Sequence, residues 1–186
     1  MDIKKTLIYF IFFGIIISFF GGFILGENSA GAGGYVGDLS WIKKNIEIFK
    51  NNTTLEAIKH PDIFGNRPPL IYIINKFFNP FFYDLERYRI CVFVLSLVGP
   101  FFLFIGLKIK FKNIKTEYLA VLSVLILLSP YYRTSGFWAL NENYGVISAI
   151  ISLMFLNLSL LKNSLDGLKE KFYLHCTVFF SSSCVY

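Results

Sequence analysis

Residues 6–26 read TLIYFIFFGIIISFFGGFILG, a run of 21 residues without a single charged side chain. About 20 apolar residues are enough for a helix to cross the hydrocarbon core of a bilayer. Lys4 and Lys5 precede the run, so a cleaved signal peptide is the alternative, but the run is long for a signal-peptide core. The stretch therefore predicts a retained membrane-spanning helix near the N-terminus.

The composition of the whole chain favours a bilayer environment. Of its 186 residues, 55% are hydrophobic and 16% are charged, whereas soluble domains carry about 25% charged residues. The net charge of +6 comes from basic residues that separate apolar runs. No basic face with interleaved aromatic residues is present, so a nucleic-acid partner is not expected. The three cysteines lie inside apolar runs and have no metal-ligand spacing.

Further apolar runs follow the first one, and the last of them is partial because the chain stops within it: 90–107, 118–132, 143–161 and 172–186. Pro100 is expected to kink the second span. We therefore predict an all-α fold, in which residues 1–186 form the single membrane domain of a polytopic helical protein. The partial fifth span indicates a truncated chain.

Lysines in the short loops predict the orientation of these spans. Residues 108–117 carry four lysines and residues 162–171 carry three, whereas residues 133–142 carry only Arg133. By the positive-inside rule the first two loops and the N-terminus are cytoplasmic. Residues 27–88 then form a large external loop, and the predicted location is a bacterial inner (plasma) membrane.

The external loop is expected to contain helices that lie along the membrane interface. Apolar residues at helical spacing predict an amphipathic helix over about 39–50: Leu39, Ile42, Ile46 and Phe49. Thr53 and Glu56 form a capping box that opens a short helix. The apolar segment 69–83 is too short to span easily and predicts an interfacial helix whose phenylalanines dip into lipid: Phe77, Phe78, Phe81 and Phe82. If this segment did span, both lysine-rich loops would be external.

Residues 31–41 read GAGGYVGDLSW and place Asp38 just outside the first span. The glycines do not form a dinucleotide-binding fingerprint, because the last required glycine falls on Val36. Asp38 has two interpretations. It is the N-cap of the following helix, or it is a carboxylate presented at the membrane surface that takes a proton from an acceptor hydroxyl. In the second case the glycines let the chain fold back, so that Asp38 lies near Glu142 or Arg133.

A second acid and two arginines lie in the same two external loops: Glu142, Arg67 and Arg133. Carboxylates could hold a divalent metal, and cations could stabilise a departing phosphate. Each residue also has a simpler interpretation. Glu142 could be a solvated loop acid, Arg133 could mark a helix end at the lipid headgroups, and Arg67 could be an ordinary interfacial residue. No cofactor is therefore certain.

The order of these features resembles the N-terminal part of the GT-C type of polyprenyl-phosphate-sugar glycosyltransferases. This group includes the protein O-mannosyltransferases and the lipid A aminoarabinose transferases. Its members have an acid early in the first external loop, which Asp38 matches, and a Pro-Pro-Leu that opens a helix there, which residues 68–70 match. A basic residue before the second span corresponds to Arg87 or Arg89, and an acid after the third span corresponds to Glu142.

The resemblance covers roughly residues 1–161 and implies transfer of a sugar from a polyprenyl-phosphate donor to an acceptor at the outer membrane face. Asp38 would then be the general base, and Glu142 would orient the acceptor or a metal. Arg67 and Arg133 would bind the donor phosphate. The implied partners are membrane lipid and the lipid-linked sugar donor.

The chain also departs from the family pattern. Leu39 follows Asp38 where a second acid is common, and Glu142 stands alone where the family more often has an Asp or a paired acidic motif, so metal use stays open. The family has more spans, so this chain alone is expected to be inactive. The alternative function is a non-catalytic transporter or polymer-export subunit. A transporter would be expected to place ionisable groups inside its spans, and these apolar runs contain no Lys, Arg, Asp or Glu.

Overall fold

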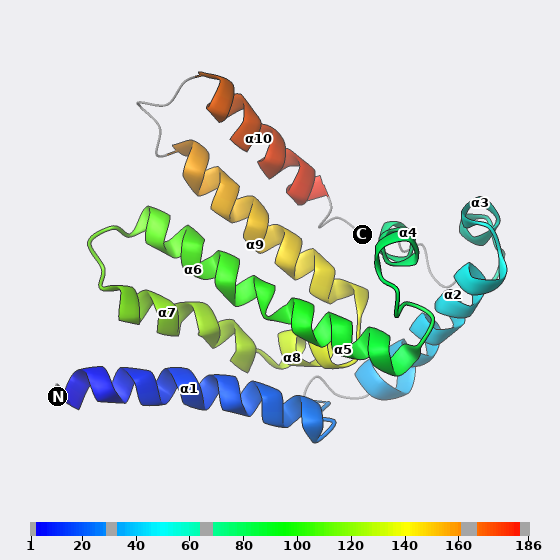
Figure 1. The fold of residues 1–186 in the computed structure, drawn as a ribbon, viewed down its shortest axis with the longest axis horizontal. Coiled ribbons are helices and arrows are strands. Elements are labelled where there is room, and N and C mark those ends of the chain that lie inside the picture. Colours follow the sequence, from blue (N-terminus) through cyan, green and yellow to red (C-terminus); the bar gives the residue numbers. More distant parts are fainter. Residues whose placement is uncertain (1–2, 29–32, 64–68, 161–166, 183–186) are drawn as a thin grey trace.

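The computed structural model describes residues 3–28, 33–63, 69–160 and 167–182 (Figure 1). Throughout this part of the chain every regular element is helical, which confirms the predicted all-α class. The elements run in chain order as α1 (Ile3–Ile24), the π-helical η1 (Gly33–Asp38), α2 (Leu39–Asn51), α3 (Thr54–Ile58), α4 (Leu70–Phe78), α5 (Leu85–Ser96), α6 (Val98–Lys110), α7 (Thr116–Val124), the 3-10 helix η2 (Leu125–Leu128), α8 (Pro130–Phe137), α9 (Asn141–Leu160) and α10 (Gly167–Ser182).

Of the described helices, three are long and apolar enough to cross a membrane. They are α1 with 22 residues, the continuous α5–α6 helix with 26 residues and α9 with 20 residues. They coincide with the runs predicted at 6–26, 90–107 and 143–161. The run predicted at 118–132 forms the shorter apolar helix Thr116–Leu128. The partial run at 172–186 overlaps α10.

The long helices lie side by side in a bundle (Figure 1). Helix α9 packs between α6 and α10, and α7 packs between α6 and α1. Helices α2, α3 and α4 gather at the end of the bundle where α1 finishes and where α5 and α9 begin. We call this the α8 end. The start of α1 and the turn between α6 and α7 lie at the opposite end, which we call the lysine end.

Pro100 interrupts the long helix at Leu97, as its position in the apolar run predicts. Proline has no backbone N–H, so the carbonyl of Ser96 loses its usual helical partner. The hydroxyl of Tyr132 donates to this carbonyl at 2.5 Å. Gly99 leaves the space for that hydroxyl, because a Cβ at this position would collide with it. The kink therefore becomes the contact point between the long helix and α8.

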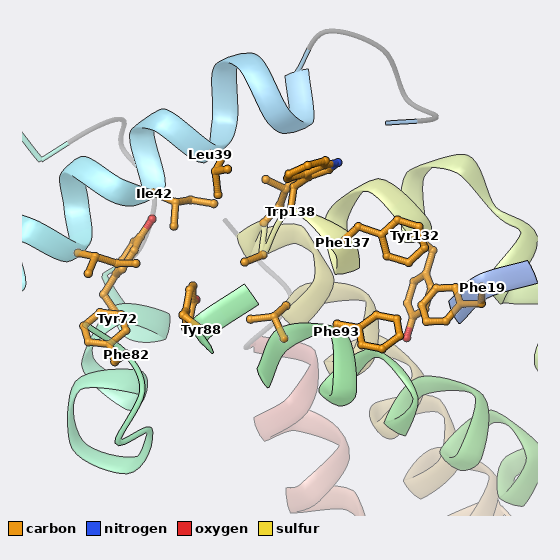
Figure 2. Packing of buried hydrophobic residues seen from close by; sticks show 14 of the residues in the cluster. Phe19, Leu39, Ile42, Tyr72, Phe82, Tyr88, Phe93, Tyr132, Phe137 and Trp138 are labelled. Atoms are coloured by element: carbon orange, nitrogen blue, oxygen red, sulfur yellow. The ribbon is translucent and has the colours of Figure 1, made fainter. Parts of the chain in front are cut away.

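Aromatic rings from three helices form the part of the core next to this contact (Figure 2). The ring of Phe19 on α1 stacks on Phe93 of α5 with centroids 5.4 Å apart, and it lies 5.0 Å from the ring of Phe137 on α8. Phe19 and Phe137 are fully buried. Aromatic pairs of this kind stabilise the packing by roughly 0.5–1.5 kcal/mol each.

The segment between α1 and α5 confirms most of its predicted local structure. Helix α2 buries all four residues of the expected apolar face. The capping box of Thr53 and Glu56 is present, and the hydrogen bond from the Thr53 side chain lowers the pKa of Glu56. Helix α4 is shorter than the predicted segment 69–83 and ends at Phe78, before Pro80. The prediction for Phe82 is wrong, because this side chain is fully buried in the core rather than facing lipid.

Candidate functional site

Helix α8 occupies a position for which the sequence predicted the end of a span followed by an external loop from residue 133. Ser129 caps the helix by accepting a hydrogen bond from the backbone of Tyr132, and Pro130 occupies the first turn, where proline is well tolerated. From Tyr132 to Phe137 every residue of α8 is buried. Arg133 therefore lies inside the protein rather than in a solvated loop.

Arg133 is held in a buried ion pair with Glu27, which follows α1. Nε of Arg133 donates to Oε1 of Glu27 at 2.8 Å, and Nη2 donates to Oε2. The remaining donors reach the carbonyl oxygen of Ser18 at 2.9 Å and that of Leu127 at 3.2 Å. The arginine side chain is 7% exposed and the glutamate side chain 33%. Each nitrogen of the guanidinium thus donates a hydrogen bond to α1, to Glu27 or to η2.

Gly22 provides the space in which this ion pair forms. A Cβ at Gly22 would lie 2.5 Å from Oε2 of Glu27 and would also collide with Nη2 of Arg133. Only glycine therefore lets α1 approach the pair this closely. The sequence did not indicate Glu27 as a partner of Arg133, because the two residues are 106 positions apart.

Arg89 and Trp138 form a second cationic centre next to the pair. The guanidinium of Arg89 lies 4.2 Å from the centroid of the Trp138 ring, and its Nε donates to the carbonyl oxygen of Phe137 at 3.1 Å. Nε1 of Trp138 donates to the carbonyl oxygen of Glu27 at 2.9 Å. The resemblance left Arg87 and Arg89 as alternatives. Arg89 is the one that contacts α8, through Phe137, and its side chain is 12% exposed. Arg87 pairs with Asp84 and is 65% exposed.

Asp38 stands at the junction of η1 and α2 and is half-buried. Its backbone is helical, with φ −66° and ψ −38°, and its side chain makes no capping hydrogen bond. The N-cap interpretation is therefore wrong. Throughout the described ranges, its carboxylate takes part in no hydrogen bond or ion pair.

The glycine-rich stretch positions Asp38 by packing rather than by flexibility. Residues 33–38 form η1, and Gly34 is buried against α8. A Cβ at Gly34 would lie 2.5 Å from Cγ2 of Thr134 and 3.0 Å from Cδ1 of Trp138. The ring of Tyr35 lies 4.7 Å from that of Trp138. Gly34 thus lets the turn that leads to Asp38 rest directly on α8.

Replacing Gly34 with alanine should separate η1 from α8. The added methyl group overlaps Thr134, and overpacking of this kind costs about 1–3 kcal/mol. The thermal unfolding midpoint of the purified protein should therefore fall. The matched control is Gly21→Ala, because a Cβ at Gly21 meets no atom within 4 Å. Equal midpoints for the two variants would contradict the close packing of η1 on α8.

Glu142 lies in the first turn of α9, beside a buried polar network that also involves α2. The hydroxyl of Tyr72 on α4 accepts hydrogen bonds from Asn45 at 3.1 Å and from Asn141 at 3.3 Å. Asn45 belongs to the helix that begins next to Asp38, and Asn141 precedes Glu142 in the chain. Tyr72 therefore ties the helix that follows Asp38 to the start of the helix that carries Glu142.

A second set of hydrogen bonds runs alongside the first. The amide of Asn75 donates to the hydroxyl of Tyr144 at 3.1 Å, and this hydroxyl lies 3.4 Å from that of Tyr88. Tyr88 is fully buried, so its hydroxyl needs such a partner. The sequence did not indicate this network. Polar residues opening an otherwise apolar helix, as in the stretch NENYG, were the signal that could have found it.

The structure thus brings three of the four predicted site residues to the α8 end, namely Asp38, Arg133 and Glu142. Arg67 lies outside the described residues. Within the described ranges, no group of three or more His, Cys, Asp or Glu side chains could hold a metal ion. The two acids, Asp38 and Glu142, are half-buried. Arg89 and Arg133 are held in place by neighbouring aromatic rings and carboxylates. This arrangement is suited to accepting a proton and binding an anion.

No family model, no curated protein and no solved structure matches this chain. The class that the fold itself defines is a helical protein, in whose described residues three helices are long and apolar enough to span a membrane.

Proposed function

We propose that the protein is a polytopic membrane glycosyltransferase that moves a sugar from a polyprenyl-phosphate donor to an acceptor at the outer face of a bacterial inner membrane. The observation that carries this proposal is the meeting of several elements with charged residues at α8. Arg133 lies on α8 and Arg89 bonds to its end. The turn η1, which ends at Asp38, packs on α8 through Gly34. Glu142 lies in the first turn of α9, which follows α8. A lipid-linked phosphate places its charged head at the end of such a bundle and its tail along the apolar helices. The resemblance to GT-C transferases leads to the same class of reaction.

The proposed orientation places the lysine end in the cytoplasm and the α8 end outside. Lys5 lies in the first turn of α1, Lys108 in the last turn of α6 and Lys115 directly before α7, so all three are at the lysine end, where the positive-inside rule expects them. At the α8 end, Phe77 and Phe78 of α4 are 66% and 82% exposed. Lys76 points back into the protein, since its Nζ donates to the carbonyl oxygens of Phe49 and Asn52. Helix α4 can therefore lie in the interface without putting this charge into lipid.

The proposed reaction uses Asp38 as the base. The acceptor hydroxyl loses its proton to the carboxylate of Asp38 and its oxygen attacks the anomeric carbon of the sugar. The bond between that carbon and the phosphate oxygen breaks, and polyprenyl phosphate leaves with the bonding electrons. Both arginines are paired with a glutamate: Arg89 with Glu86 and Arg133 with Glu27. Arg89 is the better candidate for binding this phosphate, because the Glu86 side chain is 72% exposed and can leave the pair for water, whereas Glu27 is 33% exposed. Glu142 orients the acceptor.

The orientation can be tested by labelling introduced cysteines in a variant that lacks the native ones. Ser40→Cys at the α8 end and Asn113→Cys between α6 and α7 are both at exposed positions. In intact cells an impermeant thiol reagent should modify the cysteine at position 40 and leave the one at position 113 unmodified until the membrane is opened. Modification of position 113 in intact cells would reverse the orientation and move the site to the cytoplasm.

The activity can be tested in membranes from cells that produce this protein. Incubation with a radiolabelled polyprenyl-phosphate sugar and an acceptor extract should release polyprenyl phosphate and label the acceptor. Membranes with Arg89→Gln should need a higher donor concentration, and membranes with Arg87→Gln serve as the control. Movement of the intact donor across the membrane without release of phosphate would instead support the transporter alternative.

A further inference from the structure

An apolar groove runs along the bundle between α1, α6 and α7, away from the site described above. Its volume is about 380 Å³. Its lining comes from these helices and from the adjoining ends of α5 and η2, and all but one of the lining residues are apolar. The exception is Ser123, whose hydroxyl donates to the carbonyl oxygen of Ala120 at 2.7 Å. The groove therefore presents no polar group that needs water.

A second hollow of about 140 Å³ continues this groove toward the start of α1. The two share Phe12 and Ala120 as lining residues, and the second is also lined by Glu117. Nζ of Lys5 lies 3.6 Å from Oε1 of Glu117. Lys115 is exposed and stands two residues before Glu117, so lysines outnumber acids where the groove ends. The groove thus combines an apolar length with a basic end.

We propose that this groove binds an acyl chain of an anionic phospholipid, whose headgroup lies at Lys115, because Lys5 is already paired with Glu117. A volume of about 380 Å³ is typical of small-ligand pockets, which measure roughly 300–1,000 Å³. Close packing against the apolar lining holds the chain in the groove, and lysines near a membrane surface attract anionic lipids.

This inference rests on the membrane placement proposed above but not on the transferase reaction. The groove ends at the lysine end, whereas Asp38 and Arg89 lie at the α8 end. Lipid retention is measured without any sugar donor. Failure of the lipid site and failure of the transferase are therefore separate results.

The test is native mass spectrometry of the purified protein incubated with phosphatidylglycerol or with phosphatidylcholine of the same acyl chains. The protein should retain phosphatidylglycerol in preference to phosphatidylcholine. Lys115→Gln should weaken retention of phosphatidylglycerol about fivefold at low salt, the effect expected of one lysine near a membrane surface, and should leave phosphatidylcholine unchanged. Lys115 makes no side-chain cap, so the substitution spares α7. Lys59→Gln, at the exposed end of α3, is the matched control.

The groove itself is tested by Ala120→Leu, which adds bulk where the two hollows meet. This variant should lose both lipids. Gly14→Leu adds a leucine side chain at an exposed position of α1 where a Cβ meets no atom within 4 Å, and it should retain both. Unchanged lipid retention by Ala120→Leu would overturn the proposal, as would equal retention of the two headgroups by the unmodified protein.

If the Ala120→Leu protein does not accumulate in cells, a crosslinking experiment tests whether the groove binds lipid. Phe101 lines the groove and is 58% exposed, so Phe101→benzoylphenylalanine places a photoreactive group at its mouth. Adducts with phosphatidylglycerol that exceed those with phosphatidylcholine support the site. Adducts with a second protein molecule alone show that a protein covers the groove, and they overturn the proposal.

Discussion

Replacing Glu27 with glutamine should lower the free energy of unfolding by roughly 3 kcal/mol. The substitution leaves the buried guanidinium of Arg133 without its counter-charge. Removing one partner of a buried ion pair typically costs about 3–5 kcal/mol. The lower end applies here because the Glu27 side chain is one-third exposed. Chemical unfolding of the purified protein in mixed micelles measures the change.

Two further variants separate the buried charge from other effects. Asp84→Asn removes the charge from an exposed pair with Arg87 and keeps an N-cap side chain on α5, so it should cost less than about 1 kcal/mol. Glu27→Leu combined with Arg133→Met should recover most of the loss, because no unpaired charge remains buried. If Glu27→Gln costs no more than Asp84→Asn, the ion pair does not hold α1 to α8, and Arg133 becomes available again to bind a phosphate.

Asp38→Asn should reduce sugar transfer about 10²–10⁴-fold, the range typical of losing a general base. Asparagine keeps the shape of the side chain but cannot take up the acceptor proton. The free energy of unfolding should change by less than about 0.5 kcal/mol, because this carboxylate neither caps α2 nor pairs with another charge within the described ranges. Donor turnover and unfolding are measured on the same membrane preparations.

The matched control is Asp62→Asn, an acid of the same segment whose side chain is 64% exposed. It should leave both transfer and stability unchanged. Normal transfer by Asp38→Asn would remove Asp38 from the mechanism. A loss of transfer accompanied by an equal loss of folded protein would give Asp38 a structural role instead.

The local elements of this protein could be predicted because their causes lie within a few residues of one another. Apolar length predicts α1 and α9, and the spacing of Leu39, Ile42, Ile46 and Phe49 predicts the buried face of α2. The hydroxyl of Thr53 and the carboxylate of Glu56 predict the start of α3. Pro100 predicts the interruption of the long helix. Each of these rests on helix geometry, which relates residues three or four positions apart.

The composition of the candidate site could be predicted only in part. The sequence indicated Asp38, Glu142 and Arg133 as polar residues outside the apolar runs. It could not indicate that Gly34 rests on Thr134, because only the fold brings them together. For the same reason the sequence did not indicate the hydrogen bonds from Asn45 and Asn141 to Tyr72. Buried polar groups need hydrogen-bond partners, but the neighbouring sequence does not indicate which distant residues these partners are.

Arg133 shows most clearly what the sequence determined and what the tertiary structure determined. The sequence by itself determined that this residue follows an apolar run, from which a lipid-facing or phosphate-binding role followed naturally. The tertiary structure decided that it is buried against Glu27, which lies 106 residues away. A guanidinium removed from water must find a carboxylate and carbonyl oxygens at hydrogen-bonding distance. That condition is met only where α1, η2 and α8 come together, with Gly22 leaving the space between them.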